Sequence, residues 1–141
     1  MAGRLQGKVC VITGAGGGMG ADAAVRFAEE GAQIAVADVD GAAAEKVAGT
    51  VDGLAVQVDV SDEASVEALY AAAAERFGGI DVLYNNAGIS PADDASVLDT
   101  STDAWDRVQA VKGVRHVHEA SLAADRVDRL PERHALWDLL P

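Results

Sequence analysis

The stretch VCVITGAGGGMG, residues 9–20, decides the fold, because it joins a β-branched run directly to a cluster of glycines. Five of the eight residues from Thr13 to Gly20 are glycine. Glycine adopts backbone conformations closed to other residues and lets another group come close to the main chain. The run before the cluster predicts a strand, and ADAAVRFAEE at 21–30 predicts a helix that ends at Gly31. The glycines therefore form a loop between a strand and a helix.

A strand followed by a helix is the pattern that repeats over residues 1–111. Short apolar runs predict strands at 8–13, 32–38, 54–60 and 80–86, and helix-forming runs predict helices at 21–30, 42–49, 61–77 and 101–111. Ser61 is the expected N-cap of the third helix, and Trp105 and Val108 share one face of the fourth. Alternating strands and helices imply parallel strands with right-handed crossovers. We therefore expect an α/β fold, with a Rossmann-like parallel sheet and flanking helices.

Composition and charge restrict the class of protein. The chain has 141 residues, half of them apolar, which suffices for one domain with an ordinary core. Its one cysteine, Cys10, argues against a disulfide scaffold and fits a reducing compartment. No apolar run is long enough to cross a bilayer, and the net charge of −12 disfavours nucleic acid and anionic membranes. We expect a cytoplasmic protein with neither a membrane nor a nucleic acid as partner.

The position of the glycine loop predicts an anion site. A helix N-terminus presents unpaired N–H groups and the positive end of the helix dipole, which suit a phosphate or pyrophosphate. The loop lacks the Gly-Lys-Ser/Thr ending of a Walker-type loop. A glycine-rich turn with only a packing role is the alternative, and the strand before the loop and the helix after it favour the phosphate.

Asp38 favours one class of nucleotide. It ends the second predicted strand, 18 residues after Gly20. An acid there in a Rossmann unit accepts hydrogen bonds from the adenosine ribose of NAD, and its charge repels the 2′-phosphate of NADP. No lysine or arginine lies in the glycine loop or just after Asp38 to bind that phosphate. The alternative is a solvated turn aspartate beside Asp40. We expect NAD in preference to NADP.

Four motifs resemble those of the short-chain dehydrogenase/reductase family, in the family's order, over about 110 of the 141 residues. They are the cofactor loop T-G-x-x-x-G-x-G at Thr13–Gly20, the adenine contact DV at Asp59-Val60, NNAG at Asn85–Gly88, and the start of the long fifth helix at WDRVQAV, 105–111. Together they are specific, although each is common alone. The resemblance implies hydride transfer between NAD(P) and an alcohol or ketone.

The resemblance also implies which residues hold the cofactor. Gly14, Gly18, Met19 and Gly20 would bind the pyrophosphate and the nearby ribose, Asp38 the adenosine ribose, Asp59 and Val60 the adenine, and Asn86, Ala87 and Gly88 the ribose on the nicotinamide side. The implied cofactor is NAD(H), and the implied substrate of the full-length family is a small alcohol or ketone.

The catalytic residues of that family have no match here. In the family a tyrosine acts as general acid/base on the substrate oxygen, and a lysine four residues later lowers its pKa. Such a cation is needed because an unperturbed tyrosine holds its proton too tightly to be a good base at neutral pH. Here Ala74 lies four residues after Tyr70, and Gly88 lies four residues after Tyr84. We therefore assign no catalytic residue.

The composition changes near residue 112. Residues 1–111 hold 18 acidic and 6 basic residues, residues 112–141 hold 5 of each, and every glycine lies at or before Gly113. We expect an NAD-binding Rossmann-like half-domain at 1–111, truncated after its fourth strand and part of the fifth helix, and an atypical helical tail at 112–141. A departure in reading frame or splicing near residue 112 is the simplest origin of this tail, and a naturally short protein is the alternative.

Two functions remain open for the chain. The first is an NAD(H)-dependent oxidoreductase by resemblance, inactive alone because it lacks the catalytic half. The second is a non-catalytic NAD-binding or regulatory module with its own tail. His116, His118 and Glu119 lie in that tail without an accompanying acidic or cysteine cluster, so we expect no metal site. An uncovered fourth strand would favour self-association, so we expect a homo-oligomer.

Overall fold

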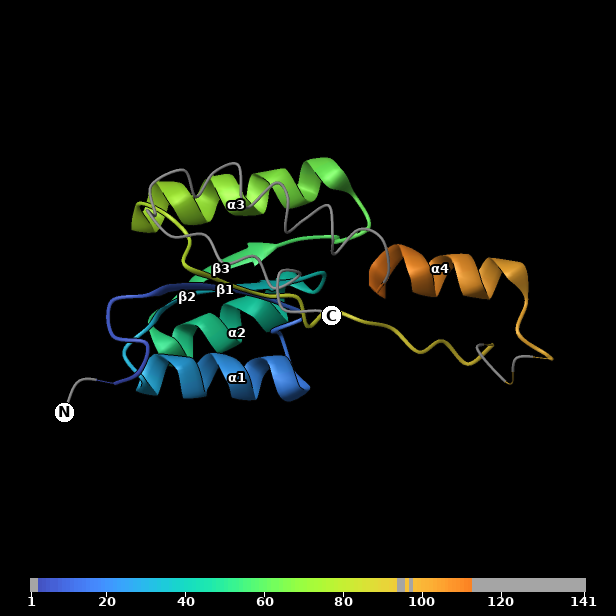
Figure 1. Ribbon diagram of the computed structural model, residues 1–141, viewed down its shortest axis with the longest axis horizontal. Coiled ribbons are helices and arrows are strands. Elements are labelled where there is room, and N and C mark those ends of the chain that lie inside the picture. Colours follow the sequence, from blue (N-terminus) through green and yellow to red (C-terminus); the bar gives the residue numbers. More distant parts are fainter. Residues whose placement is uncertain (1–2, 94–95, 97, 113–141) are drawn as a thin grey trace, which may run out of the picture.

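The computed structural model describes residues 3–93, 96 and 98–112 of the chain. In this part of the chain strands and helices alternate, as Figure 1 shows. In order they are β1 (Val9–Thr13), α1 (Gly18–Glu29), β2 (Gln33–Asp38), α2 (Gly41–Val51), β3 (Leu54–Gln57), α3 (Glu63–Phe77), β4 (Val82–Tyr84) and α4 (Thr102–Lys112).

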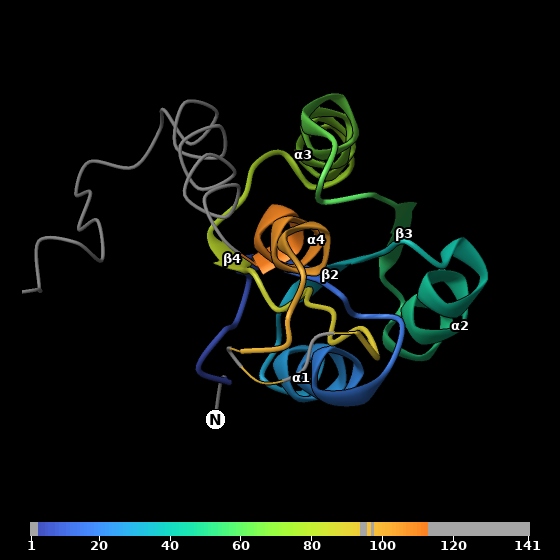
Figure 2. The same cartoon turned by 90° about the vertical axis from the view of Figure 1, so that its right-hand side faces the viewer.

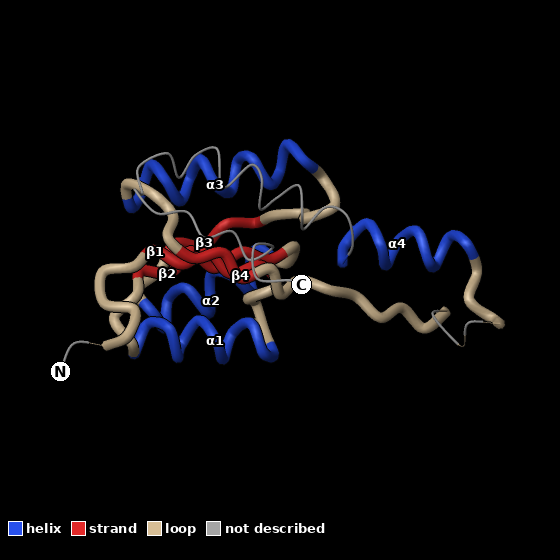
Figure 3. Tube along the Cα trace, in the orientation of Figure 1, coloured by secondary structure: helices blue, strands red, loops and turns tan. Residues whose placement is uncertain are grey.

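The strands form one parallel sheet in the order β3-β2-β1-β4. Val11 at the centre of β1 pairs with Ala35 of β2 on one side and with Leu83 of β4 on the other. Figures 2 and 3 show α1 and α2 on one face of this sheet and α3 on the other. Parallel strands are covered on both faces in this way because their side chains alternate between the two faces. The Rossmann-like α/β fold expected from the sequence is confirmed.

The core has two parts, one on each face of the sheet, because successive side chains along β1 point to opposite faces. Cys10 and Ile12 pack with residues of α1 and α2, whereas Val11 packs with residues of α3. All three side chains are inaccessible to solvent. Full burial of a valine or isoleucine side chain contributes about 1.5–3 kcal/mol. Side chains of β1 therefore pack against the helices on both faces of the sheet. This packing fixes the position of the loop that follows β1.

Several element boundaries differ from those expected. α1 begins at Gly18, inside the glycine cluster, rather than at residue 21. β3 ends at Gln57, and β4 covers only Val82–Tyr84. The N-cap of α3 is Asp62 rather than Ser61.

Asp59 explains why the cap of α3 lies one residue later than expected. Its Oδ1 accepts hydrogen bonds from the N–H of Ser61 at 2.9 Å and from the Ser61 hydroxyl at 2.6 Å. Its carbonyl accepts a further bond from the N–H of Asp62 at 3.0 Å. Because this turn engages the Ser61 hydroxyl, the carboxylate of Asp62 caps the helix, accepting from the N–H of Ala64 at 3.3 Å.

α4 extends away from the layered part of the molecule (Figure 1). Ala104 is inaccessible to solvent, Val108 is half-buried, and Val111 packs against the core on the α3 side of the sheet. Trp105, three residues before Val108 on the same helix, is 59% exposed. None of the helices in the described ranges is long and apolar enough to span a membrane. The expected tail, with its three histidines, lies from residue 113 onward outside the described residues.

Candidate functional site

The loop between β1 and α1 packs so closely against the segment after β4 and against the first turn of α1 that Gly14 and Gly20 leave no room for a side chain. Gly14 has a positive φ of 63°, and a Cβ atom on it would lie 2.7 Å from the Cα atom of Ala87. A Cβ atom on Gly20 would lie 2.3 Å from the carbonyl oxygen of Gly14. These contacts are with backbone atoms, which cannot move aside cheaply. Gly14 and Gly20 are therefore required by the packing of the loop itself.

The middle of the same loop is open. A Cβ atom on Gly17 or on Gly18 would meet no atom within 4 Å. Both glycines are exposed, and Met19 beside them is 78% exposed. Gly18 has a φ of 53°, a left-handed conformation that favours glycine. The sequence thus leaves free space in front of the first turn of α1.

The N-terminus of α1 is not capped by a side chain, unlike those of the other described helices. Its N-cap is Gly17, and its first turn holds no acidic residue. Asp40 caps α2, Asp62 caps α3, and the Ser101 hydroxyl accepts from the first turn of α4. The first N–H groups of α1 therefore face the open part of the loop, where the helix dipole favours an anion.

Asp38 lies at the carboxyl end of β2, directly beside this loop. Its Oδ2 accepts a hydrogen bond from the N–H of Gly16 at 2.9 Å, and its Oδ1 accepts one from the N–H of Asp40 at 3.0 Å. The residue is half-buried. The N–H of Ala15 donates to the carbonyl of Ala37 at 3.0 Å, which holds the loop against the end of β2. The structure therefore places the Asp38 carboxylate over the glycine loop.

The NNAG segment braces the loop from the β4 side. The Nδ2 of Asn86 donates to the carbonyls of Thr13 at 3.2 Å and Gly14 at 3.1 Å. The buried hydroxyl oxygen of Thr13 accepts from the N–H groups of Asn86 and Ala87, each at 3.2 Å. Gly88 follows this brace directly. Sequence reasoning identified Thr13 only as part of a motif, because nothing in the local sequence reveals a contact with residues more than 70 positions away.

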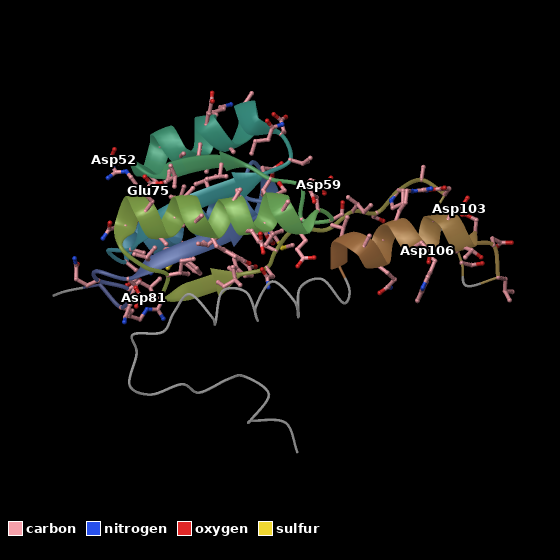
Figure 4. The ribbon with its side chains drawn as sticks, turned by 90° about the horizontal axis from the view of Figure 1, so that it is seen from above. Asp52, Asp59, Glu75, Asp81, Asp103 and Asp106 are labelled. Carbon is pink, nitrogen blue, oxygen red and sulfur yellow. The ribbon has the colours of Figure 1, made fainter. Side chains whose placement is uncertain are left out.

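The two residues expected at the adenine have different surroundings. Asp59 is exposed at the amino end of α3, where Figure 4 shows it far from Asp81 at the opposite end of the sheet. Val60 is only 7% exposed, and its side chain belongs to the core on the α3 side. A ligand at this point therefore cannot meet the Val60 side chain.

The two tyrosines and the cysteine among the described residues differ in burial. Tyr70, a residue of α3, is fully buried in the core on that side of the sheet. Tyr84 is 37% exposed, and its ring centroid lies 6.2 Å from that of Phe27 in α1. Burial, aided by the charge of Asp81, raises the pKa of the Cys10 thiol to about 11, which keeps it protonated and unreactive. No group of three metal-ligating side chains is present among these residues.

Comparison with known proteins gives a family for this geometry. Residues 8–128 match the family described as short chain dehydrogenase, so the match extends past the point where the composition changes. The chain is 49% identical over 111 residues to meso-2,3-butanediol dehydrogenase of Serratia marcescens, covering 77% of this chain and 43% of that protein. It is 42% identical over 116 residues to 2,5-dichloro-2,5-cyclohexadiene-1,4-diol dehydrogenase of Sphingobium indicum, covering 79% and 46%. The chain thus spans about half the length of the curated relatives it matches.

A solved structure agrees with the sequence matches. The crystal structure of 3-ketoacyl-(acyl-carrier-protein) reductase from Brucella melitensis complexed with NADH superposes with a TM-score of 0.75 at 43% identity. The superposition covers 83% of this chain and 48% of that chain. With its glycine loop, its parallel sheet order and these matches, the chain belongs to the short chain dehydrogenase family.

Proposed function

We infer that the loop between β1 and α1 binds NAD(H). The observation that carries this proposal is the uncapped N-terminus of α1 behind an open glycine loop, with a carboxylate at its edge. The open space at Gly17 and Gly18 is of the kind that a Cβ atom would fill and an anion can enter. Its N–H donors and positive dipole end suit a pyrophosphate, so the residues present fit a dinucleotide.

Each part of the site has a proposed role. The N–H groups of Gly18, Met19 and Gly20 would bind the pyrophosphate, with Gly14 keeping the loop close to β4. Asp38 would accept hydrogen bonds from the hydroxyls of the adenosine ribose and would repel a 2′-phosphate, so we propose NAD in preference to NADP.

The remaining proposed contacts are those with the adenine and with the ribose on the nicotinamide side. The carboxylate of Asp59 and the backbone of Val60 would hold the adenine. Asn86, Ala87 and Gly88 would line the ribose on the nicotinamide side while Asn86 continues to brace the loop.

For the whole protein we propose an NAD-dependent oxidoreductase that acts on a small alcohol or ketone. The relatives described above include dehydrogenases named for diols, which supports a hydroxyl-bearing substrate. Bound NAD would supply the hydride acceptor, and this chain would bind and orient it. A homo-oligomer in the cytoplasm is the proposed setting.

One observation favours a second function for the 141-residue chain taken alone. Neither of its tyrosines, Tyr70 and Tyr84, is followed four residues later by a lysine. A chain without that pair can bind the dinucleotide but cannot stabilise a tyrosinate for proton transfer. We therefore propose that this chain by itself is an NAD-binding module without turnover.

Calorimetric titration of the 141-residue chain with NADH and with NADPH tests the binding proposal. Gly18→Asp places a negative charge where the pyrophosphate would lie and should abolish binding of both. Gly78→Asp is the matched control, because Gly78 also has a positive φ (88°) and open space around its Cβ position, at the far end of α3. It carries the same charge and similar backbone strain, and it should bind NADH as the wild type does.

Either of two results would contradict the proposal. The first is a folded wild-type chain that binds neither dinucleotide. The second is a Gly18→Asp chain that keeps its affinity for NADH. Equal affinities of the wild type for NADH and NADPH would leave the dinucleotide site standing and overturn the role of Asp38.

A further inference from the structure

Gly16 is the loop residue that lies directly against the Asp38 carboxylate. Its N–H donates to Asp38 Oδ2 at 2.9 Å. A Cβ atom on Gly16 would lie 2.9 Å from both the Cγ and the Oδ2 atoms of Asp38, closer than real Cβ contacts allow. The absence of a side chain at position 16 is therefore what lets the carboxylate lie over the loop.

Position 16 is closed from a second direction by α2. The same Cβ atom would lie 2.9 Å from the Cβ atom of Ala43. Ala43 lies in the first turn of α2, where the carboxylate of Asp40 accepts from its N–H at 3.1 Å. Because Ala43 is fixed by this cap, an added methyl group at position 16 cannot turn away from Asp38. The end of the Asp38 side chain can turn aside, whereas the contact with Ala43 is relieved only by a small shift of the loop against α2.

The neighbouring Gly17 has quite different surroundings. No atom lies within 4 Å of its Cβ position, and its φ of −170° is an extended conformation open to any residue. A methyl group there would meet neither Asp38 nor Ala43. Two adjacent glycines of one loop thus differ in what an added methyl group would touch, which is Asp38 and Ala43 at position 16 and no atom within 4 Å at position 17.

We propose that Gly16 is a specificity-determining residue that selects NAD over NADP by positioning the Asp38 carboxylate. This inference rests on the proposed function, because it concerns the adenosine-ribose end of the same site. The N–H groups of Gly16 and Asp40 fix one oxygen each, so the carboxylate is oriented before any ligand arrives. A side chain at position 16 displaces the carboxylate. The ribose hydroxyls then lose their acceptor, and a 2′-phosphate meets less negative charge.

The test compares the ratio of dissociation constants, NADPH over NADH, in five forms of the full 141-residue chain. They are the wild type, Gly16→Ala, Gly17→Ala, Asp38→Ser and the double variant Gly16→Ala/Asp38→Ser. Loss of a hydrogen bond to a charged group weakens binding by about ten- to a hundredfold. We expect the ratio to fall by about tenfold or more in Gly16→Ala. Gly17→Ala narrows the space proposed for the pyrophosphate, which NADH and NADPH share, so it should weaken both alike and leave the ratio within about twofold of wild type.

The double variant separates positioning from a general disturbance of the loop. If Gly16 acts through Asp38, Gly16→Ala should leave the ratio unchanged once Asp38 is serine. An unchanged ratio in Gly16→Ala, or an equal fall in the Asp38→Ser background, would overturn the proposal. So would a Gly16→Ala chain that unfolds, because the backbone rather than Asp38 would then absorb the methyl group. A wild type that binds neither dinucleotide would instead overturn the proposed function, and this inference with it.

Discussion

The hydroxyl oxygen of Thr13, at the end of β1, accepts hydrogen bonds from the backbone N–H groups of both Asn86 and Ala87, each at 3.2 Å. In the opposite direction, the side-chain amide of Asn86 donates to the carbonyls of Thr13 and Gly14. The carboxyl ends of β1 and β4 are therefore tied together at the point where the glycine loop begins. This brace holds the loop in the shape that leaves the first turn of α1 open.

Replacement of Thr13 by valine should weaken the fold. Valine keeps the shape of threonine but removes the acceptor for two N–H groups, and an unsatisfied buried donor costs about 1–3 kcal/mol. Thr13→Ser is the control, because it keeps the hydroxyl and loses only a methyl group, worth about 1 kcal/mol. The free energy of unfolding, measured in urea, should be highest for the wild type, lower for Thr13→Ser and lowest for Thr13→Val. A valine variant as stable as the serine variant would show that the brace contributes nothing.

The fold itself could be predicted from the sequence. The β-branched run at 9–13, the glycines and the helix-forming residues after them gave the β1–α1 unit, and repetition of that pattern gave the parallel sheet. These are local signals, since the period of an element is written in consecutive residues. The matches at Thr13–Gly20 and Asn85–Gly88 gave the family for the same reason.

The details that depend on contacts across the chain could not be predicted. Ser61 and Asp62 are both good N-caps, and only the turn made by Asp59 decides between them. The burial of Val60 follows from its packing under α3. The contact of Gly16 with Asp38 depends on how the side chains and the loop pack at the ends of β1 and β2, which the sequence pattern does not specify.

Cys10 should be inert toward thiol reagents while the protein is folded. Burial, with a smaller contribution from Asp81, raises its pKa from the ordinary value of 9.0 to about 11, so almost no thiolate is present at pH 8. The reaction with Ellman's reagent should therefore be slow in buffer and fast in concentrated urea. Rapid reaction of the folded chain would contradict the burial of β1.

The same thiol should make the protein less stable at high pH. The pKa of the folded state is the higher one, so the unfolded chain loses this proton first. The contribution to the free energy of unfolding is fully present below pH 9.0 and is lost as the pH rises toward about 11. Cys10→Ala should remove this part of the pH dependence in urea unfolding measured between those values.

Self-association should depend on the exposed apolar residues near α4. Leu98 is 89% exposed and Trp105 is 59% exposed, and among the described strands β4 pairs with β1 alone. Exposed apolar side chains and a strand edge without a partner each favour association. Light scattering should detect a dimer or larger species that Trp105→Gln weakens. Val39→Gln is the control, because Val39 is 66% exposed directly after β2, and β1 separates β2 from β4. Equal effects of the two substitutions would exclude a specific interface at α4.

The 141-residue chain should bind NADH without oxidising it in the presence of ketones. Hydride transfer to a carbonyl needs a proton delivered to its oxygen, and loss of the general acid/base costs about 10²–10⁴-fold in rate. Tyr70 is buried, and Tyr84, packed against Phe27, has no lysine four residues later. The absorbance of NADH, followed at high protein concentration with a panel of ketones, should stay constant. In the reverse direction, NAD with secondary alcohols should produce no NADH absorbance. Turnover that persists through purification and disappears in Gly18→Asp would contradict this expectation. Tyr84→Phe, which keeps the ring and removes the hydroxyl, would then show whether Tyr84 is the missing acid, and Lys112→Met would test the lysine at the end of α4.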